Sequence, residues 1–225
     1  MTAKELAKYF DHTLLKAYAT TEDFRAFCAD CAKYDFAMAA INSAPVSLVK
    51  GLLSNTTVHV GAAIGFPLGQ TTIAVKKFET LDALQNGADE IDYVINITKV
   101  KDGDLDYIRR EMEAVVSVCR EYGALSKVIF ENCYLTDREK RNLCAVAREV
   151  EPDFIKTSTG FGTGGATLED VELMIQNVGP RVRVKAAGGV RTLETALRLI
   201  EMGVGRIGST ASVSICEEYR QKTGG

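Results

Sequence analysis

The chain has 225 residues, of which 46% are hydrophobic and 25% are charged. This length suits one large domain or two small ones, and the composition excludes a disordered chain because it supplies enough apolar residues for a sizeable core. The net charge of −3 gives no electrostatic basis for binding nucleic acid, and no apolar run is long enough to span a bilayer. The N-terminus, MTAKELAKYF, has neither an apolar signal core nor a small-residue cleavage site, so we expect a cytoplasmic protein.

Short apolar runs rich in β-branched residues recur along the chain and predict strands. Most are apolar throughout rather than alternating, which is typical of parallel strands covered on both faces. In chain order they are YFDHTLL from Tyr9 (a short candidate), FAMAAIN from Phe36, VHVGAAIG from Val58, EIDYVIN from Glu90, KVIFE from Lys127, DFIKT from Asp153, RVRVKAA from Arg181 and VGRIGS from Val204.

Longer amphipathic segments separate these runs and predict helices. TTEDFRAFCADCAKY opens with a threonine pair and early acidic residues, which suit the positive end of a helix. Thr136 is followed three residues later by Glu139, a capping-box arrangement, and Asp170 stands at the matching place after Thr167. The alternation of strands and helices predicts an α/β fold.

The number of strands decides between two α/β architectures. Seven strand–helix units are visible, and the segment from Tyr9 supplies an eighth strand. Eight units predict a closed (β/α)8 TIM barrel with parallel strands, whereas seven or fewer favour an open, doubly wound sheet. No linker or composition break divides the chain, so we expect a single domain over residues 1–225 and favour the barrel.

The six cysteines do not form a zinc-binding pattern. Cys28 and Cys31 form a lone CxxC in a helical segment, and the two histidines, His12 and His59, lie elsewhere. A thioredoxin-like site is the weaker alternative to small buried thiols in a reducing compartment. We therefore expect no metal and no cofactor.

Charged residues lie on or at the ends of successive predicted strands. Asp92 lies in EIDYVIN, while Glu131 ends KVIFE, Lys156 ends DFIK and Lys185 follows RVRV, so that the last three occupy matching places. In a barrel, reactive groups gather at the carboxyl ends of the strands. A solvated strand end or a structural ion pair explains any one of these charges, but two lysines and a carboxylate at one mouth predict a reactive site.

Glycine-rich segments accompany three of these strands: TSTGFGTGG, AAGGVR and RIGSTAS. Glycine lets backbone N–H groups approach an anion, and phosphate sites in barrels are often built from the loops after the seventh and eighth strands. Neither GxGxxG nor a Walker pattern is present. The loops therefore predict a phosphorylated small molecule rather than a dinucleotide or a nucleoside triphosphate.

Two lysines at one site have a definite chemical use. A free lysine has a pKa of about 10.4, and burial or a second cation lowers this to about 7–8 in catalytic lysines. The neutral amine attacks a carbonyl and forms a Schiff base. The protonated imine then withdraws electrons, so that a carbon–carbon bond β to it breaks without a metal.

The motifs DHTLLK, IGFPLG, GADEIDYVIN, KVIFE, DFIKTSTGF and KAAGGVR together resemble the deoxyribose-phosphate aldolase family from about Asp11 to about Ser209. The two lysine motifs are specific as a pair, whereas IGFPLG alone is not. The resemblance implies a TIM barrel and a class I aldolase of deoxyribonucleotide catabolism. This enzyme would interconvert 2-deoxy-D-ribose 5-phosphate with acetaldehyde and D-glyceraldehyde 3-phosphate. Its partners would be a phosphorylated sugar and a short aldehyde, and a homodimer is expected from the resemblance alone.

The resemblance also implies roles for individual residues. Lys156 would form the Schiff base, Lys185 would lower the pKa of Lys156, and Asp92 would relay protons through a water. Asp11 would contact a substrate hydroxyl. The residues implied around the sugar and the phosphate are Thr159, Gly160, Gly188, Gly189, Gly208, Ser209 and Thr210.

Three positions depart from the family pattern. Ala40 stands where many relatives carry a cysteine, Ala211 where some carry a hydroxyl, and Tyr219 is no obvious match for the tail tyrosine of some members. Inhibition through the cysteine, one phosphate contact and a proton-transfer role for the tail are therefore not expected here. Lys127 and Glu131 are two further charged residues near the predicted site. Each could form a buried ion pair or support Lys185 electrostatically as readily as it could take part in the chemistry, so we assign neither a catalytic role.

Other functions fit parts of the pattern. A phosphosugar isomerase shares the barrel and the phosphate loops but needs no second lysine, and a transaldolase-like lyase shares the Schiff base. A catalytically inactive phosphate-binding protein would lack a lysine or the relay aspartate, and a metal-dependent aldolase would need a histidine cluster. Borohydride trapping separates an isomerase from the lyases, and acetaldehyde as the donor separates the lyases from each other.

Overall fold

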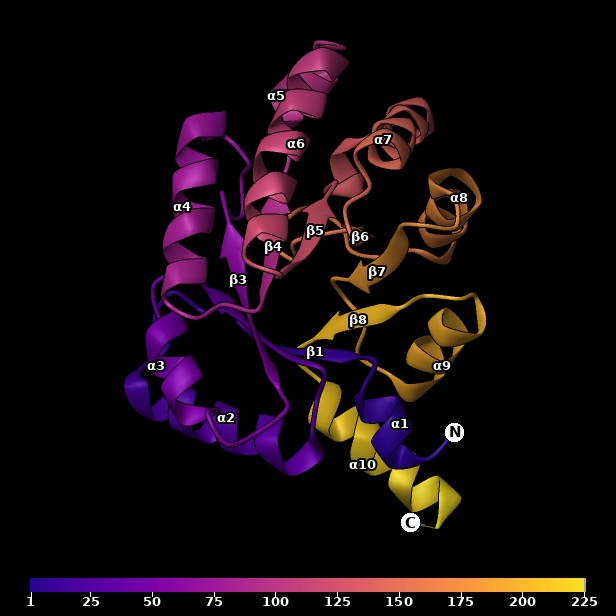
Figure 1. Ribbon diagram of the computed structural model, residues 1–225. Helices are drawn as coiled ribbons and strands as arrows, with labels where there is room; N and C mark the ends of the chain where they lie inside the picture. The colour runs from indigo at the N-terminus through magenta and orange to yellow at the C-terminus, as the bar shows by residue number, and fades with distance from the viewer. Residues whose placement is uncertain (225) are drawn as a thin grey trace.

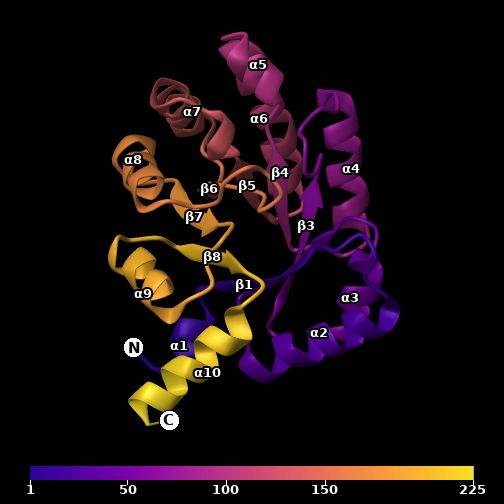
Figure 2. The same ribbon diagram turned by 180° about the vertical axis from the view of Figure 1, so that it is seen from behind.

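The computed structural model describes residues 1–224. Eight parallel strands close into a barrel in chain order, with β8 paired to β1 (Figures 1 and 2). The TIM barrel is confirmed and the open sheet is excluded. The strands are β1 (Phe10–Leu14), β2 (Met38–Asn42), β3 (His59–Ile64), β4 (Glu90–Val94), β5 (Leu125–Ile129), β6 (Phe154–Lys156), β7 (Arg183–Ala187) and β8 (Arg206–Ser209).

Helices surround the barrel, and α1 lies beside α10, so both ends of the chain are on one side (Figures 1 and 2). The α-helices are α1 (Ala3–Ala7), α2 (Thr21–Tyr34), α3 (Val46–Leu52), α4 (Ile73–Gln85), α5 (Ile97–Lys101), α6 (Leu105–Glu121), α7 (Asp137–Val150), α8 (Leu168–Val178), α9 (Leu193–Glu201) and α10 (Ser212–Thr223). A 3-10 turn, η1 (Asn132–Tyr134), follows β5. The apolar core fills the space between the barrel and the helices.

Threonine hydroxyls cap several helices at their N-termini. The capping box at α7 is confirmed, because Thr136 accepts from the Glu139 amide and the Glu139 carboxylate accepts from the Thr136 amide. At α8, Thr167 accepts from the Asp170 amide, as expected. The Asp170 carboxylate, however, pairs with Lys140 of α7. The second half of that box is thus replaced by an ion pair that links two neighbouring helices.

The bounds of β5 differ from the predicted strand. β5 begins at Leu125 and ends at Ile129, so Glu131 lies beyond it, with a left-handed φ of 55°. Lys156 pairs with Lys185 on β7 and with Ile129 on β5. The expectation that Glu131 occupies the place that matches Lys156 and Lys185 is therefore wrong, because Ile129 is the β5 residue in register with Lys156.

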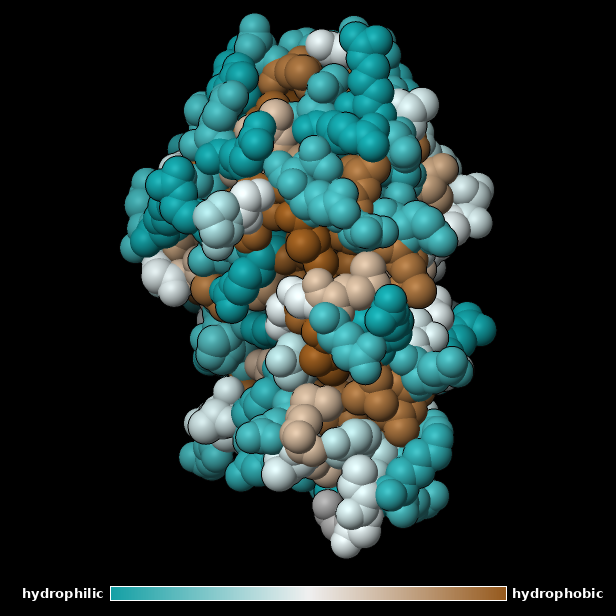
Figure 3. All heavy atoms as spheres, turned by 90° about the vertical axis from the view of Figure 1, so that its right-hand side faces the viewer, coloured by the Kyte–Doolittle hydropathy of each residue, from teal (hydrophilic) through white to brown (hydrophobic). Residues whose placement is uncertain are grey.

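The buried cysteines and the molecular surface bear on two further predictions from the sequence, a redox site and a membrane span. Cys28 and Cys31 are buried in α2, and burial raises the pKa of Cys28 to about 11, so it is a thiol rather than a thiolate. Within residues 1–224, no helix has the length and apolar character needed to cross a membrane. On the face shown in Figure 3, hydrophilic side chains cover most of the surface and hydrophobic ones gather in patches between them.

Candidate active site

Charged side chains meet inside the barrel around Lys156. Lys156 and Lys185 occupy paired positions on β6 and β7. The Lys156 Nζ donates to Asp92 Oδ2 at 2.8 Å, and the Lys185 Nζ donates to the same oxygen at 2.6 Å. The structure thus brings the two lysines and the aspartate singled out in the sequence into direct contact.

Lys127 and Asp11, two more charged residues that the sequence pointed to, contact this group. Lys127 on β5 donates to Asp92 Oδ1 at 2.6 Å. Asp11 on β1 places its Oδ2 2.5 Å from the Lys185 Nζ, as a charge contact rather than an aligned hydrogen bond. Asp11 is fully buried and does not line the cavity described below, so in this structure it faces Lys185.

The surroundings of Lys156 disfavour its charged form. Burial is the largest cause, the Lys185 and Lys127 ammonium groups act in the same direction, and Asp92 opposes them; together they lower the pKa of Lys156 to about 8. With that pKa, about a tenth of the amine is neutral at pH 7, against less than about a thousandth for a free lysine. Lys156 is therefore suited to nucleophilic attack on a carbonyl.

Asp92 remains ionised in this setting. Burial would raise its pKa, but the ammonium groups of Lys127, Lys156 and Lys185 lower the pKa well below its ordinary value. The carboxylate therefore orients three amines at once. It is hydrogen-bonded to the Lys156 Nζ, which is the distance that proton transfer requires.

A cavity of about 250 Å³ opens above Lys156, at the carboxyl ends of β6, β7 and β8. It is lined by every residue that the family resemblance implied around the sugar and the phosphate, namely Thr159, Gly160, Gly188, Gly189, Gly208, Ser209 and Thr210. Ala40, the position without the cysteine, lines it as well. A cavity of about 430 Å³ beside α2 shares four lining residues with it but does not reach Lys156.

Two glycine-rich loops are packed together beside this cavity. Gly188 and Gly189 have φ values of 87° and 79°, a region that favours glycine. A Cβ on Gly165 would lie 2.2 Å from the Gly188 carbonyl oxygen, so the loop after β6 needs glycine there to approach the loop after β7. The Ser209 hydroxyl donates to the Val190 carbonyl at 2.7 Å, which joins the loop after β8 to the same group.

Glu131 and Lys127 do different things, and they do not pair with each other. Lys127 forms an ion pair with Asp92, one of the roles that the sequence left open. The Glu131 carboxylate accepts hydrogen bonds from the amide and the hydroxyl of Thr159. The Thr159 hydroxyl oxygen in turn accepts from the Phe161 amide at 3.0 Å. Glu131 therefore orders the loop that follows the Lys156 strand.

Four charged residues near the site were missed by the sequence reasoning. Lys16 and Arg191 are exposed and line the cavity, where their charges suit a phosphate. Lys16 ends the family motif DHTLLK and Arg191 ends KAAGGVR, so the sequence carried a signal for both. Glu90 and Arg206 lie deeper in the barrel, and for Glu90 the signal was its place two residues before Asp92, on the same face of the strand.

Two other expectations concern the tail and metals. The Tyr219 hydroxyl donates to the Met1 carbonyl at 2.5 Å, so it contacts the chain terminus rather than the cavity. In the described part of the chain, no cluster of three histidine, cysteine or acidic side chains is arranged to hold a metal ion.

Known aldolases are similar to this chain over nearly its whole length. The family described as DeoC/LacD family aldolase matches residues 6–209. A deoxyribose-phosphate aldolase from Thermococcus gammatolerans is 53% identical over 98% of this chain and 99% of its own length, and one from Bacteroides thetaiotaomicron is 50% identical over 98% and 93%. The tetrameric deoxyribose phosphate aldolase from Aeropyrum pernix superimposes with a TM-score of 0.90 at 31% identity, over 98% of this chain and 93% of that one. The chain therefore belongs to the DeoC/LacD family of aldolases.

Proposed function

We propose that this protein cleaves 2-deoxy-D-ribose 5-phosphate reversibly to acetaldehyde and D-glyceraldehyde 3-phosphate through a Schiff base on Lys156. The observation that carries this proposal is the shared Asp92 oxygen, which holds the Lys156 and Lys185 amines together at the foot of the cavity. Family membership and the names of the relatives support the choice of substrate.

The reaction begins with imine formation. The neutral Lys156 amine attacks the C1 aldehyde of the open-chain sugar, water leaves, and a protonated imine forms. The Lys185 ammonium beside it contributes to the lowered pKa of the Lys156 amine, so that a larger fraction of that amine is neutral. Asp92, bonded to both nitrogens, accepts and returns protons through a bound water.

Carbon–carbon cleavage follows from the electron demand of the imine. The proton of the C3 hydroxyl is removed, the C2–C3 electron pair moves toward the iminium nitrogen, and glyceraldehyde 3-phosphate departs. The remaining enamine takes a proton at C2. Water then adds to the imine, which releases acetaldehyde and the free Lys156 amine.

The phosphate is placed by the rim of the cavity. Gly188 and Gly189, both at positive φ, line this cavity together with the exposed cations Arg191 and Lys16, and we propose that the glycine N–H groups and these two cations bind the phosphate. Thr159, held by Glu131, is proposed to contact the sugar. Asp11 is buried against Lys185, and we propose that it acts through that amine.

Reductive trapping tests the proposal. Wild-type protein incubated with acetaldehyde and borohydride should carry an ethyl group on Lys156, located by mass spectrometry of peptides. Lys156→Ala should lose both the adduct and the cleavage of deoxyribose 5-phosphate. A phosphosugar isomerase would give no adduct, a transaldolase-like lyase would give none with acetaldehyde, and an adduct that persists in Lys156→Ala would identify another amine as the nucleophile.

We also propose that residues 1–225 form one catalytic domain that acts in the cytoplasm. The homodimer stays a prediction, since the Aeropyrum pernix relative is described as tetrameric. Size-exclusion chromatography with light scattering separates these assemblies.

A further inference from the structure

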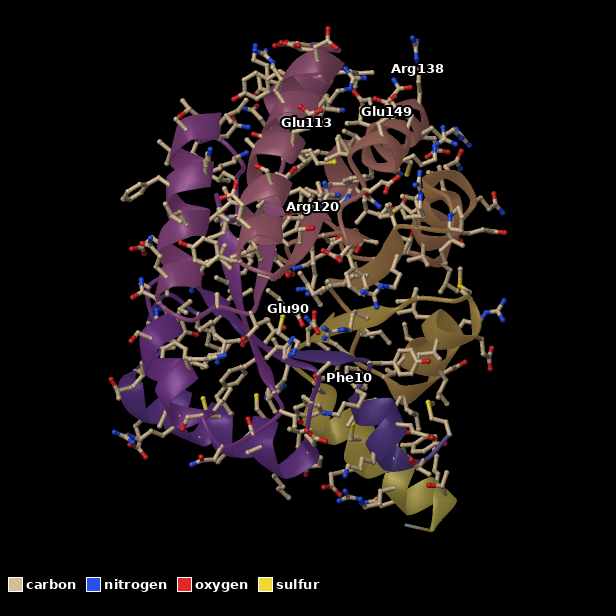
Figure 4. The ribbon with its side chains drawn as sticks, in the orientation of Figure 1. Phe10, Glu90, Glu113, Arg120, Arg138 and Glu149 are labelled. Carbon is tan, nitrogen blue, oxygen red and sulfur yellow. The ribbon has the colours of Figure 1, made fainter. Side chains whose placement is uncertain are left out.

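The inward side chains of the barrel are stacked in layers, as strand alternation requires. From the carboxyl ends inward, the charged members are Asp92 and Lys156, then Asp11, Lys127 and Lys185, then Glu90 and Arg206. Figure 4 shows Glu90 inside the ring of strands, away from the outer helices. The lowest of these layers is separate from the cavity, whose lining includes Lys156 but neither Glu90 nor Arg206.

Arg206 and Glu90 nevertheless contact the groups around Lys156. The Arg206 guanidinium donates to Glu90 Oε1 at 2.5 Å and also to Asp11 Oδ1. The other Glu90 oxygen lies 2.5 Å from the Lys127 Nζ. Glu90 is fully buried and Arg206 is nearly fully buried. Solvent therefore screens neither charge effectively.

These contacts close a ring of six alternating charges. In order, its members are Asp11, Lys185, Asp92, Lys127, Glu90 and Arg206, which returns to Asp11. Each cation contacts two carboxylates, and each carboxylate contacts two cations. The ring is therefore electrically balanced without Lys156, which joins it from outside through Asp92.

We propose that Glu90 and Arg206 are positioning residues that complete this balanced ring and so leave Lys156 as the surplus cation that gives up its proton. A protonated Lys156 would be a fourth cation on a ring with three carboxylates. The proposal rests on the proposed function only in taking Lys156 as the nucleophile. It extends the control of that amine from Lys185 to two residues that touch neither the cavity nor Lys156.

Two other titratable groups lie near the ring and do not belong to it. Glu131, beyond β5, is bonded to Thr159. His59, at the start of β3, is half exposed and bonds Glu90 at 2.7 Å, and this bond is the main cause that raises the pKa of His59. Protonation of His59 would add a positive charge beside Glu90, in the layer of the ring farthest from Lys156.

The sign of the effect distinguishes charge balance from mere structural support. Glu90→Gln leaves three cations and two carboxylates, so the pH at which Lys156 loses its proton should fall. Arg206→Met leaves two cations and three carboxylates, so this pH should rise. We expect shifts of about one pH unit in opposite directions, the size of a charge interaction across a barrel interior of moderate dielectric constant. The double variant should return close to the wild-type value.

The measurement is the pH dependence of Lys156 labelling by trace acetic anhydride, read by mass spectrometry. This readout needs no catalysis, so loss of acetaldehyde trapping in the wild type would refute the proposed function while leaving the ring testable. Glu111→Gln is the matched control, because Glu111 is a fully buried carboxylate that pairs with Lys76 outside the barrel. It should lower stability without moving the Lys156 midpoint.

Shifts in the same direction, or a shift equal to that of the Glu111 control, would overturn the proposal. If either single variant fails to fold, the double variant decides, because it removes one charge of each sign. It should then be more stable than both single variants and keep the wild-type midpoint. A double variant that is less stable than the single ones, or that has a displaced midpoint, refutes charge balance.

Discussion

Replacing Lys185 with methionine measures how much the second amine contributes to the reactivity of the first. Methionine keeps much of the length and volume of the side chain but removes the charge. Because both amines donate to one Asp92 oxygen, at 2.8 and 2.6 Å, their nitrogens are close neighbours. Removing Lys185 also leaves Asp11 with one fewer cation, which adds negative charge near Lys156.

The size of the effect follows from Coulomb's law. Two ammonium groups about 4.5 Å apart repel each other by about 4 kcal/mol at an effective dielectric constant of about 20. That energy corresponds to between two and three pKa units, at about 1.4 kcal/mol for each unit. The pKa of Lys156, lowered to about 8 in the native site, should therefore return to the range of an ordinary lysine.

The reactive form is the neutral amine, so the rate of imine formation rises with pH and levels off above the pKa. In the wild type this rise should be centred on about 8. In Lys185→Met it should be centred above about 10, and at pH of about 7.5 the neutral fraction should fall about 200-fold. The assay is the initial rate of acetaldehyde trapping on Lys156 across pH, with Lys140→Met on α7 as a control that leaves the profile unchanged.

The result that would refute this reasoning is a Lys185→Met profile still centred near pH 8. Burial is the largest single cause of the lowered pKa of Lys156. An unmoved profile would mean that burial alone is sufficient and that the second lysine has another task. A variant with the shifted profile but an unchanged maximal rate at high pH would assign Lys185 to charge control alone.

Three further substitutions test a buried ion pair, a helix cap and the loop beside the cavity. Lys76→Met should lower the free energy of unfolding in urea by about 3–5 kcal/mol, because it strands the fully buried Glu111 carboxylate; an unchanged urea midpoint would contradict this. Thr136→Ala should lower it by about 1 kcal/mol through loss of the α7 cap, and serine at the same position should retain most of the stability. Glu131→Ala should raise the KM for deoxyribose 5-phosphate by about tenfold, because it frees the Thr159 loop, but should spare acetaldehyde trapping; equal losses in both assays would show a general defect.

The lysine pair could be predicted from the sequence because each lysine is marked by the short strand segment in which it lies. Lys156 ends the segment DFIK and Lys185 follows RVRV, and neighbouring parallel strands place these two positions side by side. The capping box at Thr136 was predictable for the same reason, since all of its atoms lie within four consecutive residues. The barrel itself depended on accepting the weak strand from Tyr9, which pairs with both β2 and β8.

The features of the site that could not be predicted from the sequence are contacts between residues on strands far apart in the chain. Arg206 meets Asp11 and Glu90, from β1 and β4, although the three lie far apart in the chain. Whether those side chains meet is set by register and layer, which no spacing in the chain encodes. The role of Glu131 was not predicted because the residue lies beyond the end of β5, where it has a left-handed backbone and its carboxylate binds Thr159.

The ring also resolves a conflict within the site. A carboxylate beside the nucleophilic amine is needed to move protons, yet the same carboxylate favours the ammonium form and so suppresses nucleophilic attack. An apolar pocket would remove the second effect but also the proton carrier. Here the two oxygens of Asp92 are already engaged by Lys127 and Lys185, so its charge is compensated before Lys156 is counted. Replacing buried ion pairs with apolar residues often stabilises a protein, so stability alone does not account for six charges inside the barrel. We attribute them to the requirement that Lys156 be uncharged and in contact with a carboxylate at the same time.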